Sequence, residues 1–219
     1  LTYIMLSSSS LTNKAPNALM KKIGIYGGSF NPIHTGHISL AKQIIDIAKL
    51  DEVWFVVSPQ NPFKQNSLSL ISDEIRLELT RKALEGEQQL KVSDCEFHLP
   101  RPSYMWHTLL ALSSQHPDAE FNLIIGADNW AVFDKWYHAT DIIQNYPIIV
   151  YPREGYDLDA TTMPSGIRLV NTQLYPISST MIRTMVAEGN DITGLVPEAI
   201  KQDVYRIYGC TKKLYPSLG

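Results

Sequence analysis

The sequence predicts an α/β fold in which a mostly parallel sheet carries helices on both faces. Short apolar runs of strand length alternate with longer stretches of helical periodicity along most of the chain, which is the pattern of successive βα units. The chain has 219 residues, of which 44% are hydrophobic and 19% charged, and this is enough to bury the core of one domain. We therefore expect a single domain over residues 21–219.

Residues 1–20 differ in composition from the rest of the chain. They contain a serine tract and little periodic hydrophobicity, and they lack the basic start, apolar middle and small-residue cleavage site of a secretory signal. We expect this segment to be disordered or to result from a mis-assigned start. Met20 is then a candidate initiator, because Lys21, Lys22 and Ile23 open the first strand directly after it.

Six runs have the length and composition of strands. They are Lys22–Tyr26, Val53–Ser58, Leu90–Ser93, Phe121–Ile125, Ile148–Tyr151 and Arg168–Val170. Helical segments separate most of these runs, so neighbouring strands are expected to be parallel. The predicted fold class is therefore an α/β, doubly wound, Rossmann-like sheet.

The helices between these strands are indicated by apolar faces and capping residues. The first, over about residues 37–49, places on one side the residues that would cover the sheet, namely Leu40, Ala41, Ile44, Ile45 and Ala48. Ser72 is expected to cap a second helix, and Ser103 a third over residues 104–114. We interpret Pro152–Gly166 as a surface excursion inside the domain, although a domain boundary there stays open.

Two helices in succession are predicted to close the chain. Ser178 or Ser179 is the expected cap of a helix that ends at Gly189, and Pro197 suits the first turn of a last helix that ends at Gly209.

Charge, hydropathy and cysteine content exclude several functional classes. The net charge of −3, without a block of like charges, argues against a nucleic-acid partner. No apolar run approaches the roughly 18 residues that a membrane helix needs. Cys95 and Cys210 have neither C-x-x-C spacing nor enough partners for a disulfide framework, which indicates a reducing compartment. We expect a cytoplasmic protein, and a homo-oligomer stays open.

The segment between the first strand and the first helix has the composition of an anion site. Residues 27–37 read Gly-Gly-Ser-Phe-Asn-Pro-Ile-His-Thr-Gly-His. Glycines leave backbone amides uncovered, and a helix N-terminus concentrates unpaired N–H groups with about half a positive charge, so a phosphate is the natural ligand. No Gly-Lys-Ser/Thr follows as in a P-loop, and the glycine spacing is not the G-x-G-x-x-G of dinucleotide folds.

This segment resembles the H-x-G-H motif of the nucleotidyltransferase α/β superfamily. It stands after an apolar strand and at the start of an amphipathic helix, which is the context that the motif needs. Alternatively, His34 and His37 are ordinary turn residues or zinc ligands. A zinc site would need further Cys, His or carboxylate ligands at suitable spacing, and none is evident. We therefore interpret both histidines as phosphate-binding.

A second run of hydroxyl groups opens a helix near the C-terminus. Ser178, Ser179 and Thr180 are followed one turn later by Arg183. Alone, this is a good N-cap followed by a solvated arginine. The same superfamily has an I-S-S-T-x-x-R element, and every position of it is present from Ile177 onward. The resemblance implies that this element holds the β- and γ-phosphates of ATP.

Three further segments resemble those of the bacterial nicotinate mononucleotide adenylyltransferases. Residues 59–64 are similar to a proline- and lysine-containing loop of that family, and residues 101–109 to its P-S-Y-T-x-x-T-L segment. Gly126-Ala127-Asp128, with Trp136 downstream, matches its G-x-D and tryptophan. The five segments occur in the family's order over about residues 22–208. Met105 departs from the family, because a threonine usually stands there beside the nicotinate ring.

The resemblance implies adenylyl transfer from ATP to nicotinate mononucleotide, giving deamido-NAD and pyrophosphate in NAD biosynthesis. The catalytic residues would be His34, His37 and Arg183, and Mg²⁺ would arrive with ATP without a protein metal ligand that we can name. The residues implied for ATP are Gly27, Gly28, Ser29, Phe30, His34, His37, Ser178, Ser179, Thr180 and Arg183. Those implied for the mononucleotide are Phe30, Lys64, Ser103, Tyr104, Met105, Asp128 and Trp136, of which Trp136 would stack on the pyridine ring.

Two other functions stay open at this point. A related enzyme could adenylylate pantetheine phosphate or transfer CMP to an alcohol phosphate, although Lys64, Tyr104 and Trp136 argue against it. Alternatively, the chain could be a nucleotide-binding regulatory module without activity, which the intact His37 and Arg183 argue against. The preference for the acid or the amide form of the mononucleotide also stays open.

Overall fold

The computed structural model describes residues 20–59, 71–159, 161 and 163–209. Within them, one sheet has the strand order β3-β2-β1-β4-β5-β6, and all neighbours pair in parallel. The strands are β1 Lys21–Gly28, β2 Glu52–Val57, β3 Leu90–Ser93, β4 Ala119–Gly126, β5 Ile148–Tyr151 and β6 Ile167–Leu169. This is the order of a doubly wound Rossmann sheet, so the predicted fold class is confirmed.

The helices lie between and after the strands, as predicted. They are α1 Thr35–Ala48, α2 Asp73–Ala83, α3 Met105–Gln115, α4 Ala127–Trp130, α5 Ala139–Asn145, α6 Ser179–Glu188 and α7 Glu198–Gly209, with the 3₁₀ helices η2 Cys95–His98 and η3 Phe133–Lys135. No helix in the described part of the chain is both long and apolar enough to cross a bilayer.

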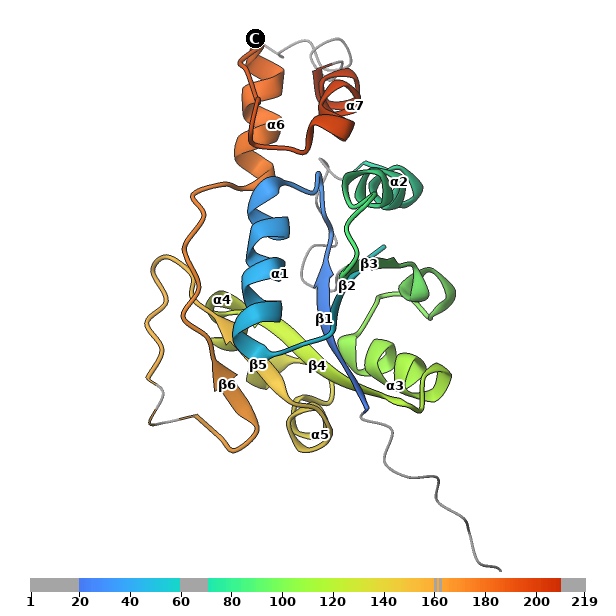
Figure 1. Cartoon of the computed structure of the whole chain (residues 1–219), viewed down its shortest axis with the longest axis vertical. Helices are drawn as coiled ribbons and strands as arrows, with labels where there is room; N and C mark the ends of the chain where they lie inside the picture. The colour runs from blue at the N-terminus through green and yellow to red at the C-terminus, as the bar shows by residue number, and fades with distance from the viewer. Residues whose placement is uncertain (1–19, 60–70, 160, 162, 210–219) are drawn as a thin grey trace, which may run out of the picture.

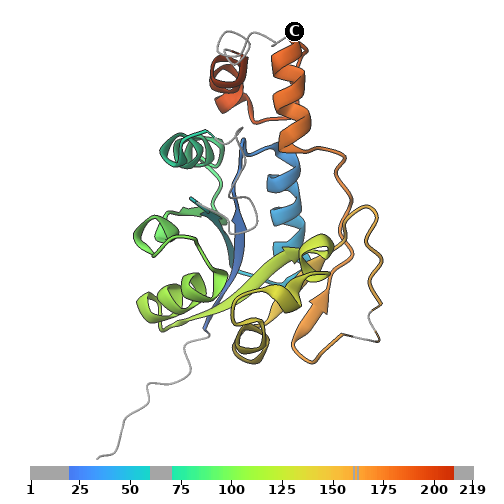
Figure 2. The ribbon, with the colours of Figure 1, turned by 180° about the vertical axis from the view of Figure 1, so that it is seen from behind.

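The sheet separates two hydrophobic layers. Along β1, Ile23 and Ile25 pack with α3 and α5, whereas Tyr26 packs with α1. Figures 1 and 2 show the ribbon from opposite sides and place α1 on one face and α5 on the other. The alternation of strand side chains between two faces explains why both faces need helical cover.

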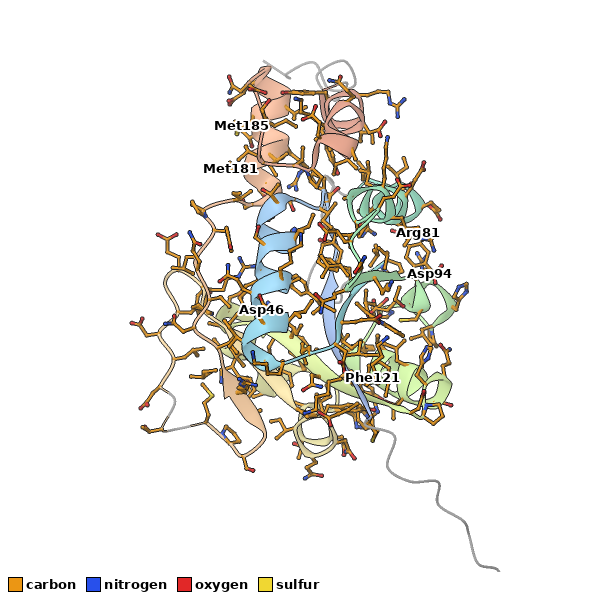
Figure 3. The ribbon with its side chains drawn as sticks, in the orientation of Figure 1. Asp46, Arg81, Asp94, Phe121, Met181 and Met185 are labelled. Atoms are coloured by element: carbon orange, nitrogen blue, oxygen red, sulfur yellow. The ribbon has the colours of Figure 1, made fainter. Side chains whose placement is uncertain are left out.

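The two C-terminal helices stand beyond the carboxyl end of β1 (Figure 1). Figure 3 places Met181 and Met185 of α6 at the opposite end of the molecule from Phe121, which lies early in β4. Buried residues of α6 and α7 join the hydrophobic layer of α1 and α2. The stretch Pro152–Gly166 connects β5 to β6, and the sheet continues across it.

Two predicted caps are confirmed and one is wrong. The hydroxyl of Ser72 accepts a hydrogen bond from the N–H of Ile75 (3.4 Å), and that of Ser178 accepts one from Met181 (3.1 Å). Ser103 does not cap α3, because the helix begins two residues later with Tyr104 as its N-cap. Ser103 is buried, and its hydroxyl lies beside a cavity rather than over the helix end.

Candidate active site

The first helix begins with two histidines that cap each other. His34 is the buried N-cap of α1, and its Nδ1 accepts a hydrogen bond from the backbone N–H of His37 (3.4 Å). The backbone N–H of His34 donates in return to Nδ1 of His37 (3.3 Å). The two rings stack with centroids 3.6 Å apart. This histidine pair forms the reciprocal bonds that Ser/Thr and Glu form in the usual capping box.

The capping bonds assign the ring protons. Because Nδ1 of each ring accepts a hydrogen bond, the proton of a neutral ring is assigned to Nε2, which is then a donor. Burial, together with the positive charge of Arg153, lowers the pKa of His34 to about 3. His34 is therefore neutral at physiological pH and can donate a hydrogen bond through Nε2.

The first-turn amides of α1 are largely used inside the protein. The N–H of Thr35 donates to the carbonyl of Leu195 (3.0 Å), and the N–H of His37 donates to the His34 ring. The sequence interpretation relied on unpaired amides at this helix start. In the folded chain, the donors that α1 offers to a phosphate are chiefly its imidazoles.

The second motif is hydrogen-bonded directly to the turn of the first. The hydroxyl of Ser179 donates to the carbonyl of Pro32 (2.8 Å), and Nη1 of Arg183 donates to that of Asn31 (2.8 Å). Arg183 also donates from Nη2 to the hydroxyl of Thr180 (3.2 Å). Because the Ser179 hydroxyl already donates within the protein, the backbone N–H of Ser179 is the donor that this residue can offer to a ligand at the start of α6.

A cavity of about 590 Å³ lies between the two motifs. It is bordered by every residue that the resemblance implied for ATP: Gly27, Gly28, Ser29, Phe30, His34, His37, Ser178, Ser179, Thr180 and Arg183. It opens at the carboxyl ends of the central strands, where β1 and β4 are neighbours and the strand order reverses. Ligands of open α/β sheets bind at such a switch point.

A second cavity, of about 130 Å³, adjoins the first and shares with it Tyr26, Gly27, Gly28, Asn129 and Tyr151. Four of the residues implied for the mononucleotide border it, namely Ser103, Tyr104, Met105 and Trp136. Asp128 and Phe30 border the larger cavity instead, and Lys64 lies outside the described residues. The structure thus brings most of the predicted residues into two connected cavities.

Close packing explains two residues of the first motif. A Cβ atom at Gly27 would lie 2.7 Å from Cε of Met105, so glycine allows the Met105 side chain to pack closely against β1 there. Phe30 is buried with a φ of 44°, and its ring packs against Tyr26, Phe55 and His37 (centroids 5.8, 5.4 and 5.2 Å). The Phe30 ring therefore packs edge-to-face against the His37 ring.

Arg153 borders the larger cavity and was not found from the sequence. Its Nε lies 3.5 Å from Oδ1 of Asp128, and its guanidinium lies over the ring of Tyr151 (5.4 Å). The positive charge of Arg153 contributes to the low pKa of His34, so the two groups interact electrostatically. A sequence signal was present, since an arginine follows strand β5 at the edge where ligands of parallel sheets bind.

Arg76 is also part of the site's framework. It is fully buried, and its guanidinium donates to the carbonyls of Ser29 (2.5 Å) and Ser58 (2.9 Å) and to the carboxylate of Asp73 (2.7 Å). It therefore ties the loops after β1 and β2 to the start of α2. Arginines on surface helices are ordinarily exposed, so no sequence signal marks this one.

The chain is similar to known proteins over most of its length. The chain matches the cytidylyltransferase-like family model over residues 25–185. A Bacteroides fragilis protein named probable nicotinate-nucleotide adenylyltransferase is 48% identical over 179 residues, which cover 82% of this chain and 89% of that protein. A protein of the same name from Bacteroides thetaiotaomicron is 47% identical over 171 residues, covering 78% and 84%.

A solved structure shares the fold. It is titled Plasmodium falciparum nicotinic acid mononucleotide adenylyltransferase complexed with NaAD, and it superposes with a TM-score of 0.70 at 22% identity. The match covers 86% of this chain and 97% of that one. From the family model and the two Bacteroides relatives, the chain belongs to the cytidylyltransferase-like family and, within it, to the nicotinate-nucleotide adenylyltransferases.

Proposed function

We propose that this chain transfers the adenylyl group of ATP to nicotinate mononucleotide, forming deamido-NAD and releasing pyrophosphate. The observation that carries the proposal is the shared cavity of the two motifs, joined by the bonds of Ser179 and Arg183 to the Asn31–Pro32 turn. Family membership supports the choice of acceptor, because the relatives are named for that substrate.

The reaction needs positioning more than acid–base chemistry. An oxygen of the mononucleotide 5′-phosphate attacks the α-phosphorus of ATP, and the bond from that phosphorus to the bridging oxygen of pyrophosphate breaks. A phosphate monoester has a second pKa of about 6, so the nucleophile is mostly dianionic at neutral pH and needs no general base. The protein must bring two anions together and stabilise charge on the transferred group.

In this proposal the histidines act on the transferred phosphate and α6 acts on the leaving group. The Nε2–H groups of His34 and His37 donate to oxygens of the α-phosphate. The backbone N–H groups at the start of α6, with the remaining N–H groups of Arg183, hold the departing pyrophosphate. Arg153 adds a further positive charge at the same cavity.

The pyridine ring of the mononucleotide would occupy the smaller cavity. Trp136 borders that cavity with its ring half-buried, which is compatible with stacking on the pyridine. Met105 and Tyr104 lie at the start of α3, whose free amides favour a negative group. Asp128 would hydrogen-bond the mononucleotide, and the role implied for Lys64 stays a prediction.

Mg²⁺ fits this site as an ion carried by the triphosphate. The described residues contain no group of three or more His, Cys, Asp or Glu side chains that could hold a metal, and Asp128 is the one carboxylate among the residues that border the larger cavity. Magnesium often uses one or two carboxylates plus substrate oxygens. The ion would neutralise phosphate charge when bound.

We also propose that residues 21–219 act as one catalytic domain in the cytoplasm. Both motifs belong to the same cavity, so separating them would divide the site. Cys95 is a buried free thiol, which suits a reducing compartment.

A pyrophosphate-release assay with ATP and Mg²⁺ tests the proposed function. The acceptor panel contains nicotinate mononucleotide, nicotinamide mononucleotide and pantetheine phosphate, and mass spectrometry identifies each product. We expect release with a pyridine mononucleotide and formation of the dinucleotide. The proposal would be contradicted if none of the acceptors gave release, or if pantetheine phosphate were the one acceptor that did.

A matched pair of variants strengthens this assay. Arg183→Gln should lower turnover by about 10²-fold, the usual scale for removing a group that stabilises transition-state charge. Arg81→Gln is the control, because Arg81 makes a half-exposed ion pair with Asp94 on the surface (2.8 Å; Figure 3). Equal activities of the two variants would contradict the role of Arg183.

A further inference from the structure

The smaller cavity contains a buried carboxyl group to which the reaction described above assigns no role. Glu96 lies in η2, is 2% exposed, and borders the cavity together with Ser103, Tyr104 and Trp136. Its Oε1 accepts a hydrogen bond from the hydroxyl of Thr108 (2.8 Å). Its Oε2 is fully buried and has no hydrogen-bond partner among the described residues.

The surroundings of Glu96 favour its neutral form. Burial raises the pKa of Glu96, and the groups that act in the opposite direction are the hydroxyls of Thr108, Ser58 and Ser103. No lysine, arginine or histidine in the described chain forms an ion pair with this carboxyl. A buried carboxylate without a cation is unfavourable, so the proton is retained more readily than in water.

The hydrogen bond from Thr108 assigns the position of that proton. Since Oε1 accepts from Thr108, it acts as the carbonyl oxygen, and the hydroxyl hydrogen is on Oε2. A protonated carboxyl is then a donor at the atom that lacks a protein partner. In its neutral form, Glu96 therefore has an O–H group at Oε2 and no negative charge beside the cavity.

The other polar groups at this cavity are also mostly donors. Nε1 of Trp136 can only donate, and the hydroxyl of Ser103 is able to; both are buried without a hydrogen-bond partner in the ranges that the structure describes. Tyr104 is the N-cap of α3 and makes no side-chain capping bond, so the helix start adds free N–H groups and a partial positive charge. A ligand group with only acceptor atoms is complementary to these donors.

We propose that Glu96, as a hydrogen-bond donor through Oε2, is a specificity-determining residue that makes this site prefer a pyridine ring bearing a carboxylate over one bearing a carboxamide. The inference rests on the proposed function. A carboxylate can accept hydrogen bonds from Glu96 and from its donor neighbours. The NH₂ group of a carboxamide would instead meet a donor, and one buried donor would be left unpaired.

Ionisation of Glu96 would reverse this preference. Oε2 would then be an acceptor that repels a carboxylate and can accept from a carboxamide. We therefore expect the acid-to-amide ratio of kcat/KM to fall as the pH rises through the ionisation of Glu96. An unmade hydrogen bond to a charged group corresponds to about a 10- to 100-fold change in this ratio.

Other titratable groups also lie near the cavity. Burial raises the pKa of the neighbouring Cys95 thiol to about 11, and burial raises the pKa values of Tyr26 and Tyr151 as well. Lys135, Tyr104 and Tyr137 also border the cavity. His107 of α3 contacts the rings of Tyr104 and Tyr137 (6.0 and 5.4 Å), so His107→Asn is included as a control for its ionisation.

The test compares the wild-type protein with Glu96→Gln and Glu96→Leu between about pH 6 and about pH 9, a range that a raised carboxyl pKa can enter. kcat/KM is measured for nicotinate and nicotinamide mononucleotides. Glutamine keeps a donor at every pH, so Glu96→Gln should retain the acid preference without pH dependence. Leucine lacks the donor, so Glu96→Leu should lose most of the preference at every pH.

Controls separate this inference from general damage and from the proposed function. Glu87→Gln removes a carboxylate from an exposed ion pair with Lys42 (2.7 Å), and this variant should keep the wild-type ratio and its pH dependence. Calorimetric binding of the two mononucleotides gives an acid-to-amide ratio even if neither is turned over. An unchanged ratio in Glu96→Leu, or a wild-type ratio independent of pH, would overturn the role of Glu96.

Discussion

The two connected cavities differ in how their polar groups are satisfied before a ligand binds. At the larger cavity, His34 and His37 cap each other, and Ser179 and Arg183 are bonded to the Asn31–Pro32 turn. At the smaller cavity, buried polar atoms of Glu96, Ser103 and Trp136 have no hydrogen-bond partner among the described residues. Most polar groups of the larger cavity are thus bonded within the protein, with Oδ1 of Asp128 as an exception among the described residues, whereas those of the smaller cavity are available to a ligand.

This difference matches the role that we propose for each cavity, charge stabilisation at the larger one and substrate selection at the smaller one. Groups that stabilise charge in a transition state act best when they are already fixed, because no reorganisation is then needed during the reaction. Groups that select a ring substituent gain selectivity when only the correct ligand satisfies them. Substitutions at the larger cavity should therefore lower both stability and turnover, and those at the smaller cavity should change affinity and specificity.

The largest effect is expected from Arg76, which fixes a wall of the larger cavity. Arg76→Met removes a buried guanidinium that donates to the carbonyls of Ser29 and Ser58, and it leaves Asp73 with Arg101 as its remaining cation (3.0 Å). The free energy of unfolding should therefore fall by about 3–5 kcal/mol. Urea denaturation measures this loss. The control Arg81→Met breaks an exposed pair and should cost at most about 1 kcal/mol. Similar losses in both variants would contradict the assignment.

The next largest effect concerns His37, which caps α1 and for which we propose a catalytic role. His37→Ala should lower kcat by about 10²-fold, because one donor to the transferred phosphate is lost. It should also lower the free energy of unfolding by about 1 kcal/mol, because half of the capping box disappears. Steady-state kinetics and denaturation measure the two effects. Near-normal turnover would refute the catalytic role, and unchanged stability would refute the capping role.

A smaller effect is expected from His34 as the pH falls. Its pKa is lowered from 6.5 to about 3 in the folded chain, so below pH 6.5 the unfolded chain binds a proton that the folded chain does not. The free energy of unfolding should therefore fall by about 1 kcal/mol as the pH decreases from 6.5 to about 5.5. His34→Asn can still cap the helix, and it should remove this contribution. An unaltered acid slope in a denaturation series would contradict it.

The smallest effect is expected from Trp136, at the smaller cavity. Trp136→Phe keeps an aromatic ring but removes an N–H that has no hydrogen-bond partner in the described residues. The KM for the mononucleotide should rise by about 3- to 10-fold, as for the loss of one hydrogen bond, while stability and the KM for ATP stay near wild type. A clear loss of stability, or equal changes in both KM values, would show that this indole is structural.

Much of the fold and of the larger cavity could be predicted because the signals are local. The bounds of β3 and β5 agree with the structure, and Ser178 and Gly189 bound α6 as expected. Capping residues act over a single turn, so a short stretch of sequence contains the whole interaction. The prediction for Ser103 failed because burial beside the smaller cavity, rather than the helix end, determines where its side chain lies.

By itself, the sequence determined the chemistry of each half of the site: a histidine-bearing turn before α1 and a hydroxyl-rich start of α6. Only the tertiary structure decided that both border one cavity with Arg153, that Glu96 borders the adjoining cavity, and that Arg76 joins the loops after β1 and β2. The reason is that these three act through groups on other elements, which the strand order brings to one edge of the sheet. No local pattern contains contacts between residues so far apart in the chain.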